Sequence, residues 1–320
     1  RAAMRAVRQA GSIAIGFNAE GTHRVLDLAE CHVLRPELFL LVAPLRALLP
    51  PLVPPGQAAG VTMTLSETGV DLLLSNLRAD GRSAELAAFA EAQDLARLAV
   101  EGPGGVEVVA LRRTPAVSMG GSQVALPPAA FLQATADGEA ALVSAVTAAC
   151  AGAGRVADLF SGLGTFALPL VEAGARVLAA DASAAAVAAL ARASGGRRLE
   201  TQHRDLFRRP LTPAELAPFD AVVFDPPRAG ASGQAAAIAR SRVPLAVAVS
   251  CNPATFARDA ALLAEGSAEA RLTRFIEDHR SKQGQLPTLN DLAANGFGDE
   301  VVHLRRAGEG AEIGAARGDV

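Results

Sequence analysis

The chain has 320 residues, 50% of them hydrophobic, so it can bury a sizeable core and has the length of two domains. Its formal net charge of -3 argues against a protein that binds nucleic acid through overall charge. Three cysteines and no apolar run long enough for a membrane helix lead us to expect a cytoplasmic protein with no disulfide framework and no membrane partner. We also expect a monomer.

Residues 1–125 are expected to form a smaller, β-rich α+β domain. Alternating apolar residues predict strands over 12–17, 60–66 and 69–75, the last two forming a hairpin. A helical period predicts helices over 37–49 and 83–98. Prolines and glycines in 115–128 mark the expected boundary. Because the chain begins at Arg1 without methionine, we expect an N-terminal piece to be missing.

From residue 126 to about 306, apolar strands and helices alternate, and 307–320 are expected to form a flexible tail. The predicted strands are 155–159, 175–181, 221–225 and 245–250. The predicted helices are 137–151, 166–173, 184–193, 233–240 and 255–264. This alternation predicts an α/β fold with a mostly parallel, doubly wound sheet, whose ligands bind at the carboxyl ends of the strands.

A glycine-containing loop, Ser161-Gly162-Leu163-Gly164-Thr165, follows the first of these strands and opens a helix. Its glycines allow a ligand to approach the backbone closely. The loop lacks the third glycine of the dinucleotide fingerprint and the lysine of a phosphate loop, which argues against nicotinamide and ATP. The alternative is an ordinary tight turn.

Two acids follow the next strands. Asp181 ends its strand, where a carboxylate can accept hydrogen bonds from both ribose hydroxyls of a nucleoside. Asp205 follows a further short β-like run and can contact an adenine edge, or else it is a solvated loop acid.

The segments Asp225-Pro226-Pro227-Arg228 and Ser250-Cys251-Asn252-Pro253 follow two later strands. Two prolines give the first a rigid backbone without amide donors, which suits a planar base. Cys251 leaves its strand just before a new helix, a position that favours a nucleophilic thiolate. Cys150, inside an alanine-rich helix, is expected in the core.

Together, Asp158-Leu-Phe-Ser-Gly-Leu-Gly-Thr-Phe166, Phe224-Asp-Pro-Pro-Arg-Ala-Gly230 and Val249-Ser-Cys-Asn-Pro253 resemble the RNA (uracil-5-)-methyltransferases that modify ribosomal and transfer RNA. The resemblance covers about 12–274 and implies a class I methyltransferase domain that uses S-adenosylmethionine. It places Asp225 between cofactor and base and makes Cys251 the nucleophile. The residues that it implies around the cofactor are Gln133, Phe160, Thr165, Asp181 and Asp205, with Gly162 and Gly164 in the loop.

Further upstream, Gly16-Phe17 and Val25 to Leu34 resemble the central domain of the ribosomal-RNA branch. There the cysteine matching Cys31 is the last of four ligands of a 4Fe-4S cluster. The other three would precede Arg1, so this chain cannot complete the cluster. Alternatively, Cys31 is a small apolar residue.

The C-terminal part departs from the family. The resemblance implies a His-x-Glu whose glutamate is the general base, and 275–298 contains none. Val301 to Arg306 resemble the closing strand, which makes Glu300 the best substitute and Asp299 the second. Alternatively, Pro287 to Phe297 form a helix-turn-helix that reads nucleic acid.

The sequence therefore predicts an enzyme that methylates carbon 5 of a uridine in RNA, ribosomal RNA before transfer RNA. Two alternatives stay open: a methyltransferase acting on an amino group, in which Cys251 is incidental, and a catalytically impaired RNA-binding remnant of the family.

Overall fold

The structure is a computed structural model that describes residues 1–9, 12–19 and 21–266. Its contacts divide the chain into two compact units, Arg1–Asp205 and Leu206–Val320, which are described one after the other. The domain limits predicted at 125 and 306 stay predictions. No helix among the described residues is long and apolar enough to cross a membrane.

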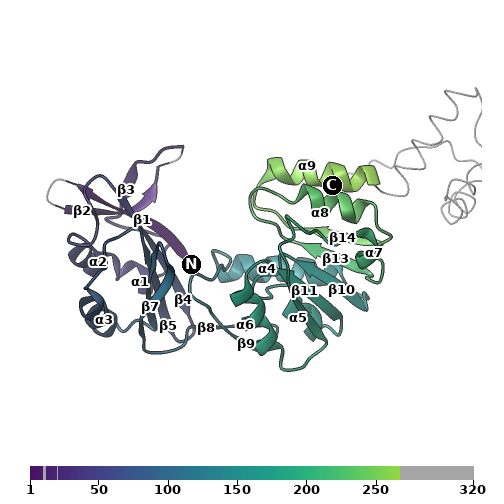
Figure 1. The fold of residues 1–320 in the computed structure, drawn as a ribbon, viewed down its shortest axis with the longest axis horizontal. Coiled ribbons are helices and arrows are strands. Elements are labelled where there is room, and N and C mark those ends of the chain that lie inside the picture. Colours follow the sequence, from purple (N-terminus) through teal and green to yellow (C-terminus); the bar gives the residue numbers. More distant parts are fainter. Residues whose placement is uncertain (10–11, 20, 267–320) are drawn as a thin grey trace, which may run out of the picture. The chain divides into compact units, whose positions relative to one another are not determined.

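The first unit begins with a seven-stranded sheet in the order β3-β2-β1-β4-β5-β6-β7 (Figure 1). Its strands are β1 (Ala2–Gln9), β2 (Ser12–Asn18), β3 (Val25–Asp27), β4 (Ala58–Ser66), β5 (Gly69–Ser75), β6 (Arg97–Gly102) and β7 (Gly105–Leu111). Neighbours are antiparallel except β5 and β6, which the helix α3 (Ser83–Ala92) connects. Met4, Ile15, Met63 and Leu72 are among the buried residues of its core.

Two helix predictions for this part are wrong in extent. The segment 37–49 forms two helices, α1 (Pro36–Phe39) and α2 (Val42–Leu48). Pro44 has no N–H to donate to the carbonyl of Leu40, so one continuous helix cannot form, whereas proline is tolerated in the first turn of α2.

The helix predicted over 83–98 ends at Ala92. Asp94 takes a left-handed φ of 48°, and Arg97 begins β6 opposite Asp71 of β5. Apart from Arg97, the run Leu95 to Val100 is apolar and fits a buried helix or a buried strand. Pairing of β6 with β5 decided that most of it is a strand.

A buried ion pair lies on this sheet. The guanidinium of Arg97 donates from Nε and Nη2 to the two carboxylate oxygens of Asp71, at 2.8 and 2.6 Å. Its Nη1 also donates to the carbonyl of Leu126, at 2.8 Å. Arg97 and Asp71 are only 4% and 8% exposed, so each charge depends on the other.

The rest of the first unit contains the hairpin of β8 (Ala116–Met119) and β9 (Ser122–Ala125), and then an alternation of helices and parallel strands. The helices are α4 (Ala136–Ala149), α5 (Ala167–Glu172) and α6 (Ala184–Ser194), and the strands are β10 (Arg155–Leu159), β11 (Arg176–Asp181) and β12 (Leu199–His203). The strand β11 pairs with β10 on one side and β12 on the other, both in parallel.

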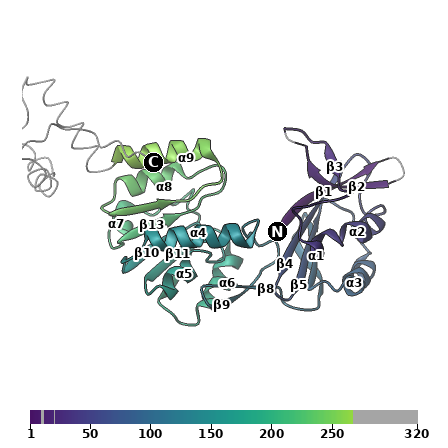
Figure 2. The same cartoon turned by 180° about the vertical axis from the view of Figure 1, so that it is seen from behind.

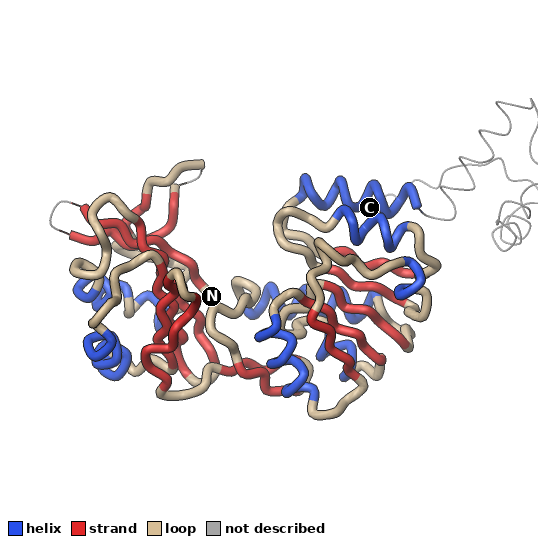
Figure 3. Tube along the Cα trace, in the orientation of Figure 1, coloured by secondary structure: helices blue, strands red, loops and turns tan. Residues whose placement is uncertain are grey.

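In the second unit, helices and parallel strands again alternate along the chain (Figures 2 and 3). It comprises α7 (Pro213–Leu216), β13 (Ala221–Phe224), α8 (Ser232–Ala239), β14 (Leu245–Ala248) and α9 (Pro253–Gly266). The strands β13 and β14 are parallel, with Phe224 opposite Ala248. The carboxyl ends of both strands therefore lie at the same edge.

Candidate active site

The loop after β10 has an unusual backbone. Phe160, Gly162 and Gly164 take φ values of 62°, 54° and 95°, in or near the left-handed region that favours glycine. A Cβ on Gly162 would meet nothing within 4 Å, whereas one on Gly164 would lie 2.4 Å from Cδ1 of Leu190. Gly164 is thus required for packing against α6, and Gly162 leaves the backbone open to a ligand.

Asp181 braces this loop. Its Oδ2 accepts a hydrogen bond from the N–H of Gly162 at 2.9 Å, and its Oδ1 accepts one from the N–H of Ser183 at 2.7 Å. A carboxylate has about four acceptor positions, so each oxygen keeps capacity for a further donor. The predicted acid at the end of β11 therefore lies directly beside the predicted glycine loop.

These residues fit the nucleoside part of S-adenosylmethionine. The open face at Gly162 and the remaining acceptor capacity of Asp181 suit a ribose that carries two hydroxyl donors. Among the described residues, neither Oγ of Ser161 nor Oε1 of Gln202 has a hydrogen-bond partner, although both atoms are buried. Ser161 is in the glycine loop after β10. Gln202 is on β12, opposite Ala180 of β11, the residue before Asp181.

The other predicted cofactor residues lie in the same unit. Thr165 follows Gly164 and is half-buried. Gln133 is half-buried in the segment between β9 and α4, and Asp205 is half-buried after β12. Their roles stay predictions.

In the second unit, Asp225 directly follows β13, whose four residues are all buried. Burial raises the pKa of the Asp225 carboxyl above its usual value. Pro226 is buried and Pro227 exposed, and the N–H of Gly230 donates to the carbonyl of Pro227 at 2.8 Å. The strand predicted to include Asp225 ends one residue earlier.

Cys251 is exposed just beyond β14 and two residues before α9. The N–H of Val249, one residue past β14, donates to the carbonyl of Phe224 in β13 at 3.0 Å. The backbone pairing of the two strands therefore continues one residue beyond β14. Asn252 caps α9, because its Oδ1 accepts from the N–H of Ala254 at 3.1 Å. The structure thus brings Asp225 and Cys251 to the ends of two neighbouring parallel strands.

The other two cysteines differ from Cys251. Cys150 ends α4 and is buried, and burial together with the charge of Asp158 raises the pKa of its thiol. Cys31 is half-buried, and no group of three or more His, Cys, Asp or Glu within the described ranges is placed to hold a metal ion. The described residues therefore do not fit a 4Fe-4S cluster. The proposed bases Glu300 and Asp299 lie outside the described residues.

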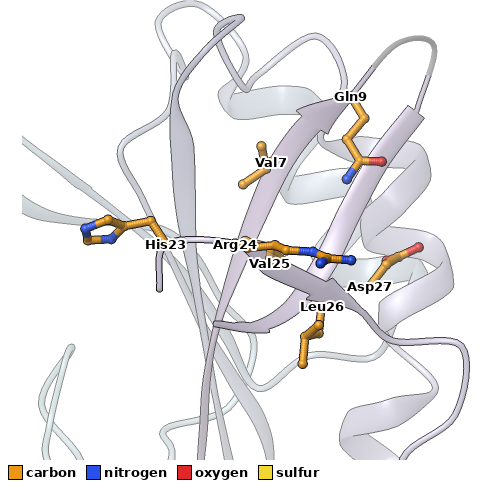
Figure 4. Close-up of a pocket in the computed structure, with 7 residues that line it drawn as sticks. All are labelled: Val7, Gln9, His23, Arg24, Val25, Leu26 and Asp27. Atoms are coloured by element: carbon orange, nitrogen blue, oxygen red, sulfur yellow. The ribbon is translucent and has the colours of Figure 1, made fainter. Parts of the chain in front are cut away.

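A pocket of about 400 Å³ lies in the β-rich part of the first unit (Figure 4). It is lined by residues of β1 and of the segment around β3: Val7, Gln9, His23, Arg24, Val25, Leu26 and Asp27. Asp27 is engaged by Arg46, whose Nη2 donates to its Oδ1 at 2.6 Å. No residue predicted for the active site lines this pocket.

The sequence did not single out the side chains of α9 that contact the loop after β13, among them Thr255, Arg258 and Asp259. A signal was present, because Arg258-Asp259 is a charged pair in an otherwise apolar stretch of helix. Nothing in the sequence indicated which loop that pair contacts.

No model of a known protein family matches the chain. It is 42% identical over 272 residues to a Brucella suis protein named "Uncharacterized RNA methyltransferase", covering 83% of this chain and 64% of that protein. A Zymomonas mobilis protein of the same description is 43% identical over 269 residues, covering 83% and 68%. A third relative, "23S rRNA (uracil(1939)-C(5))-methyltransferase RlmD" of Chromohalobacter salexigens, is 34% identical over 275 residues, covering 80% and 56%.

Among solved structures, the chain is similar to the Pyrococcus abyssi tRNA (uracil-54, C5)-methyltransferase in complex with S-adenosyl-L-homocysteine. The TM-score is 0.61 at 20% identity, and the match covers 82% of this chain and 68% of the other. This likeness confirms the predicted fold class, a class I methyltransferase fold preceded by a β-rich domain. The chain itself spans somewhat less than two thirds of the length of the Brucella suis relative, 64%.

Proposed function

Because the chain belongs to the RNA methyltransferase family, we propose that it transfers a methyl group from S-adenosylmethionine to carbon 5 of a uridine in RNA. The substrate class is ribosomal RNA, with transfer RNA as the second choice. The relative named as a 23S rRNA uracil methyltransferase supports this order. The observation that carries the proposal is the exposed Cys251 beyond β14, at the edge where the neighbouring β13 presents Asp225.

The chemistry of carbon 5 explains the need for a cysteine. This carbon is a poor nucleophile in uracil, and addition of the Cys251 thiolate to carbon 6 would make it nucleophilic. S-adenosylmethionine would supply the electrophilic methyl group. A general base must then remove the proton from carbon 5, so that the C–S bond breaks and the thiolate leaves. We assign this last role to Glu300, with Asp299 as the alternative.

The residues of the first unit would hold the cofactor. Asp181 would accept the ribose hydroxyls while it braces Gly162, and Phe160, Thr165, Gln133 and Asp205 would surround the remaining parts of the cofactor. Asp225, from the second unit, would lie beside the base. The proline-stiffened backbone after Asp225 presents carbonyl groups and no amide donors at two successive positions. That arrangement suits a planar base with a ring N–H donor, such as the N3–H of uracil.

The test is a covalent complex with RNA that contains 5-fluorouridine. The fluorine cannot be removed as a proton, so the adduct should accumulate and survive denaturation in the presence of S-adenosylmethionine. Peptide mass mapping should place it on Cys251. Cys251→Ala should form no adduct and keep its affinity for S-adenosylhomocysteine, whereas Cys31→Ala, a matched change at another non-buried cysteine, should react normally.

Two other functions predict a different result. A methyltransferase acting on an amino group would transfer methyl groups to RNA or protein without any adduct, and Cys251→Ala would remain active. An impaired RNA-binding remnant would bind RNA and give neither product. A Cys251→Ala protein that still methylates uridine would exclude the covalent mechanism.

A further inference from the structure

The first turns of α9 bind the loop that follows β13. The carbonyl of Arg228 accepts from Nδ2 of Asn252 at 3.0 Å and from Oγ1 of Thr255 at 3.2 Å. The next carbonyl, of Ala229, accepts from Nη2 of Arg258 at 3.0 Å. Two successive backbone carbonyls of the loop are therefore held by side chains of one helix and its cap.

A buried carboxylate continues this contact. Asp259 is 3% exposed, and its Oδ2 accepts from the N–H of Ala231, the residue before α8, at 2.6 Å. Its Oδ1 accepts from Nε and Nη2 of Arg258, at 2.9 and 2.7 Å. A buried carboxylate is costly unless it is paired and hydrogen-bonded, and both conditions hold here. Asp259 thus links α9 to α8, which lie side by side (Figures 1 and 2).

Gly230 lets the two segments touch. Its φ is 72°, and a Cβ at this position would lie 2.4 Å from Nη2 of Arg258, 2.6 Å from Oδ2 of Asp259 and 3.0 Å from Cβ of Thr255. Ordinary contacts begin at 3.4 Å, so a methyl group here would have to displace the Arg258 guanidinium and the buried Asp259 carboxylate, which holds Ala231, by up to about 1 Å. The loop backbone is therefore in direct contact with α9.

This contact joins the two segments proposed to carry the chemistry. Asn252, which holds the loop, is the residue after Cys251, and the loop it holds begins with Asp225 and two prolines. We propose that Asp259 and Gly230 are positioning residues that fix the Asp225 loop against the Cys251 segment and thereby set the rate at which Cys251 attacks a uridine. The inference rests on the function proposed above, and neither residue contacts the reacting atoms in it.

The experiment measures the rate of adduct formation with 5-fluorouridine RNA at saturating S-adenosylmethionine, as a function of RNA concentration. Gly230→Ala should slow the maximal rate roughly tenfold to a hundredfold, the effect of a displacement of about 1 Å. The half-saturating RNA concentration and the affinity for S-adenosylhomocysteine should stay unchanged. A loss caused by partial unfolding would instead lower the amount of reactive protein, which the final adduct yield reports.

The matched control is Gly196→Ala. Gly196 has a similar φ of 79°, but a Cβ there would meet nothing within 4 Å, so this variant carries the backbone strain without the contact. It should react at the unmodified rate. Asp259→Asn provides a second test if Gly230→Ala does not fold, because asparagine keeps the size and one acceptor for Ala231 but loses the charge that binds Arg258. We expect it to slow the maximal rate by about tenfold.

The outcomes separate the two proposals. Normal adduct formation in both Gly230→Ala and Asp259→Asn, with an active unmodified protein, would refute the positioning role and leave the proposed function intact. An equal slowing in Gly196→Ala would also refute it, because backbone strain would then be the cause. No adduct in the unmodified protein would overturn the proposed function, and the positioning role with it.

Discussion

Asp181→Ala tests the cofactor half of the site, and its effect on stability follows from two hydrogen bonds. The substitution removes the acceptors of the Gly162 and Ser183 amides, at 2.9 and 2.7 Å. The Ser183 amide bond is exposed, so water can replace the carboxylate there, whereas the Gly162 bond is partly buried. A hydrogen bond to a charged group contributes about 1.5 to 3 kcal/mol. The free energy of unfolding should therefore fall by about this amount, the contribution of the Gly162 bond alone.

The same substitution should weaken cofactor binding. Loss of hydrogen bonds to the ribose hydroxyls costs about 1.5 to 3 kcal/mol for each bond, so the dissociation constant should rise at least tenfold. Disorder of the Gly162 loop would add to this loss. Asp181→Asn should be intermediate, because its amide oxygen can serve one of the two backbone donors while its NH₂ group faces the other.

Two measurements check this reasoning: titration calorimetry with S-adenosylhomocysteine, and urea unfolding of the free protein. Glu200→Ala, at an exposed acid on β12, is the control for removing one negative charge and should change neither quantity. Reduced stability with unchanged affinity would show that Asp181 only braces the loop. Unchanged stability would refute the role of its two hydrogen bonds in holding the loop.

Four further predictions follow from the site and the core. Asp71→Ala leaves Arg97 buried without its carboxylate, so urea unfolding should show a loss of about 3 to 5 kcal/mol. Cys150→Ala should cost roughly 1 kcal/mol of stability and leave methyl transfer unchanged in a filter assay. Burial raises the pKa of Asp225, so stability should fall as pH rises from 3.8 through the raised pKa, and urea unfolding of Asp225→Asn should lack that fall. Glu300→Gln should accumulate a covalent complex with ordinary uridine RNA, visible on a denaturing gel. Normal turnover in this variant would show that another residue is the general base.

The sequence by itself determined the alternation of strands and helices. The limits of 155–159 and 69–75 were predicted to the residue, because a glycine stands at or just before the start of each short run and turn-forming residues follow closely after its end. It also placed Phe160 and Cys251 just past predicted strand ends, whereas the predicted strand 221–225 included Asp225, which follows the end of β13. Such information is local, and a single sequence carries it.

Only the tertiary structure decided the rest. Leu95 to Val100 has no intrinsic period that separates helix from strand, and pairing with β5 made most of it a strand. The second role of Asp181, the brace of Gly162, depends on two strand ends meeting across the parallel pair β10 and β11. The contact of Asp259 with Ala231 joins residues 28 positions apart, and no local pattern encodes it. Burial and hydrogen-bond partners are properties of the packed chain, so they gave these residues their roles where residue type and spacing could not.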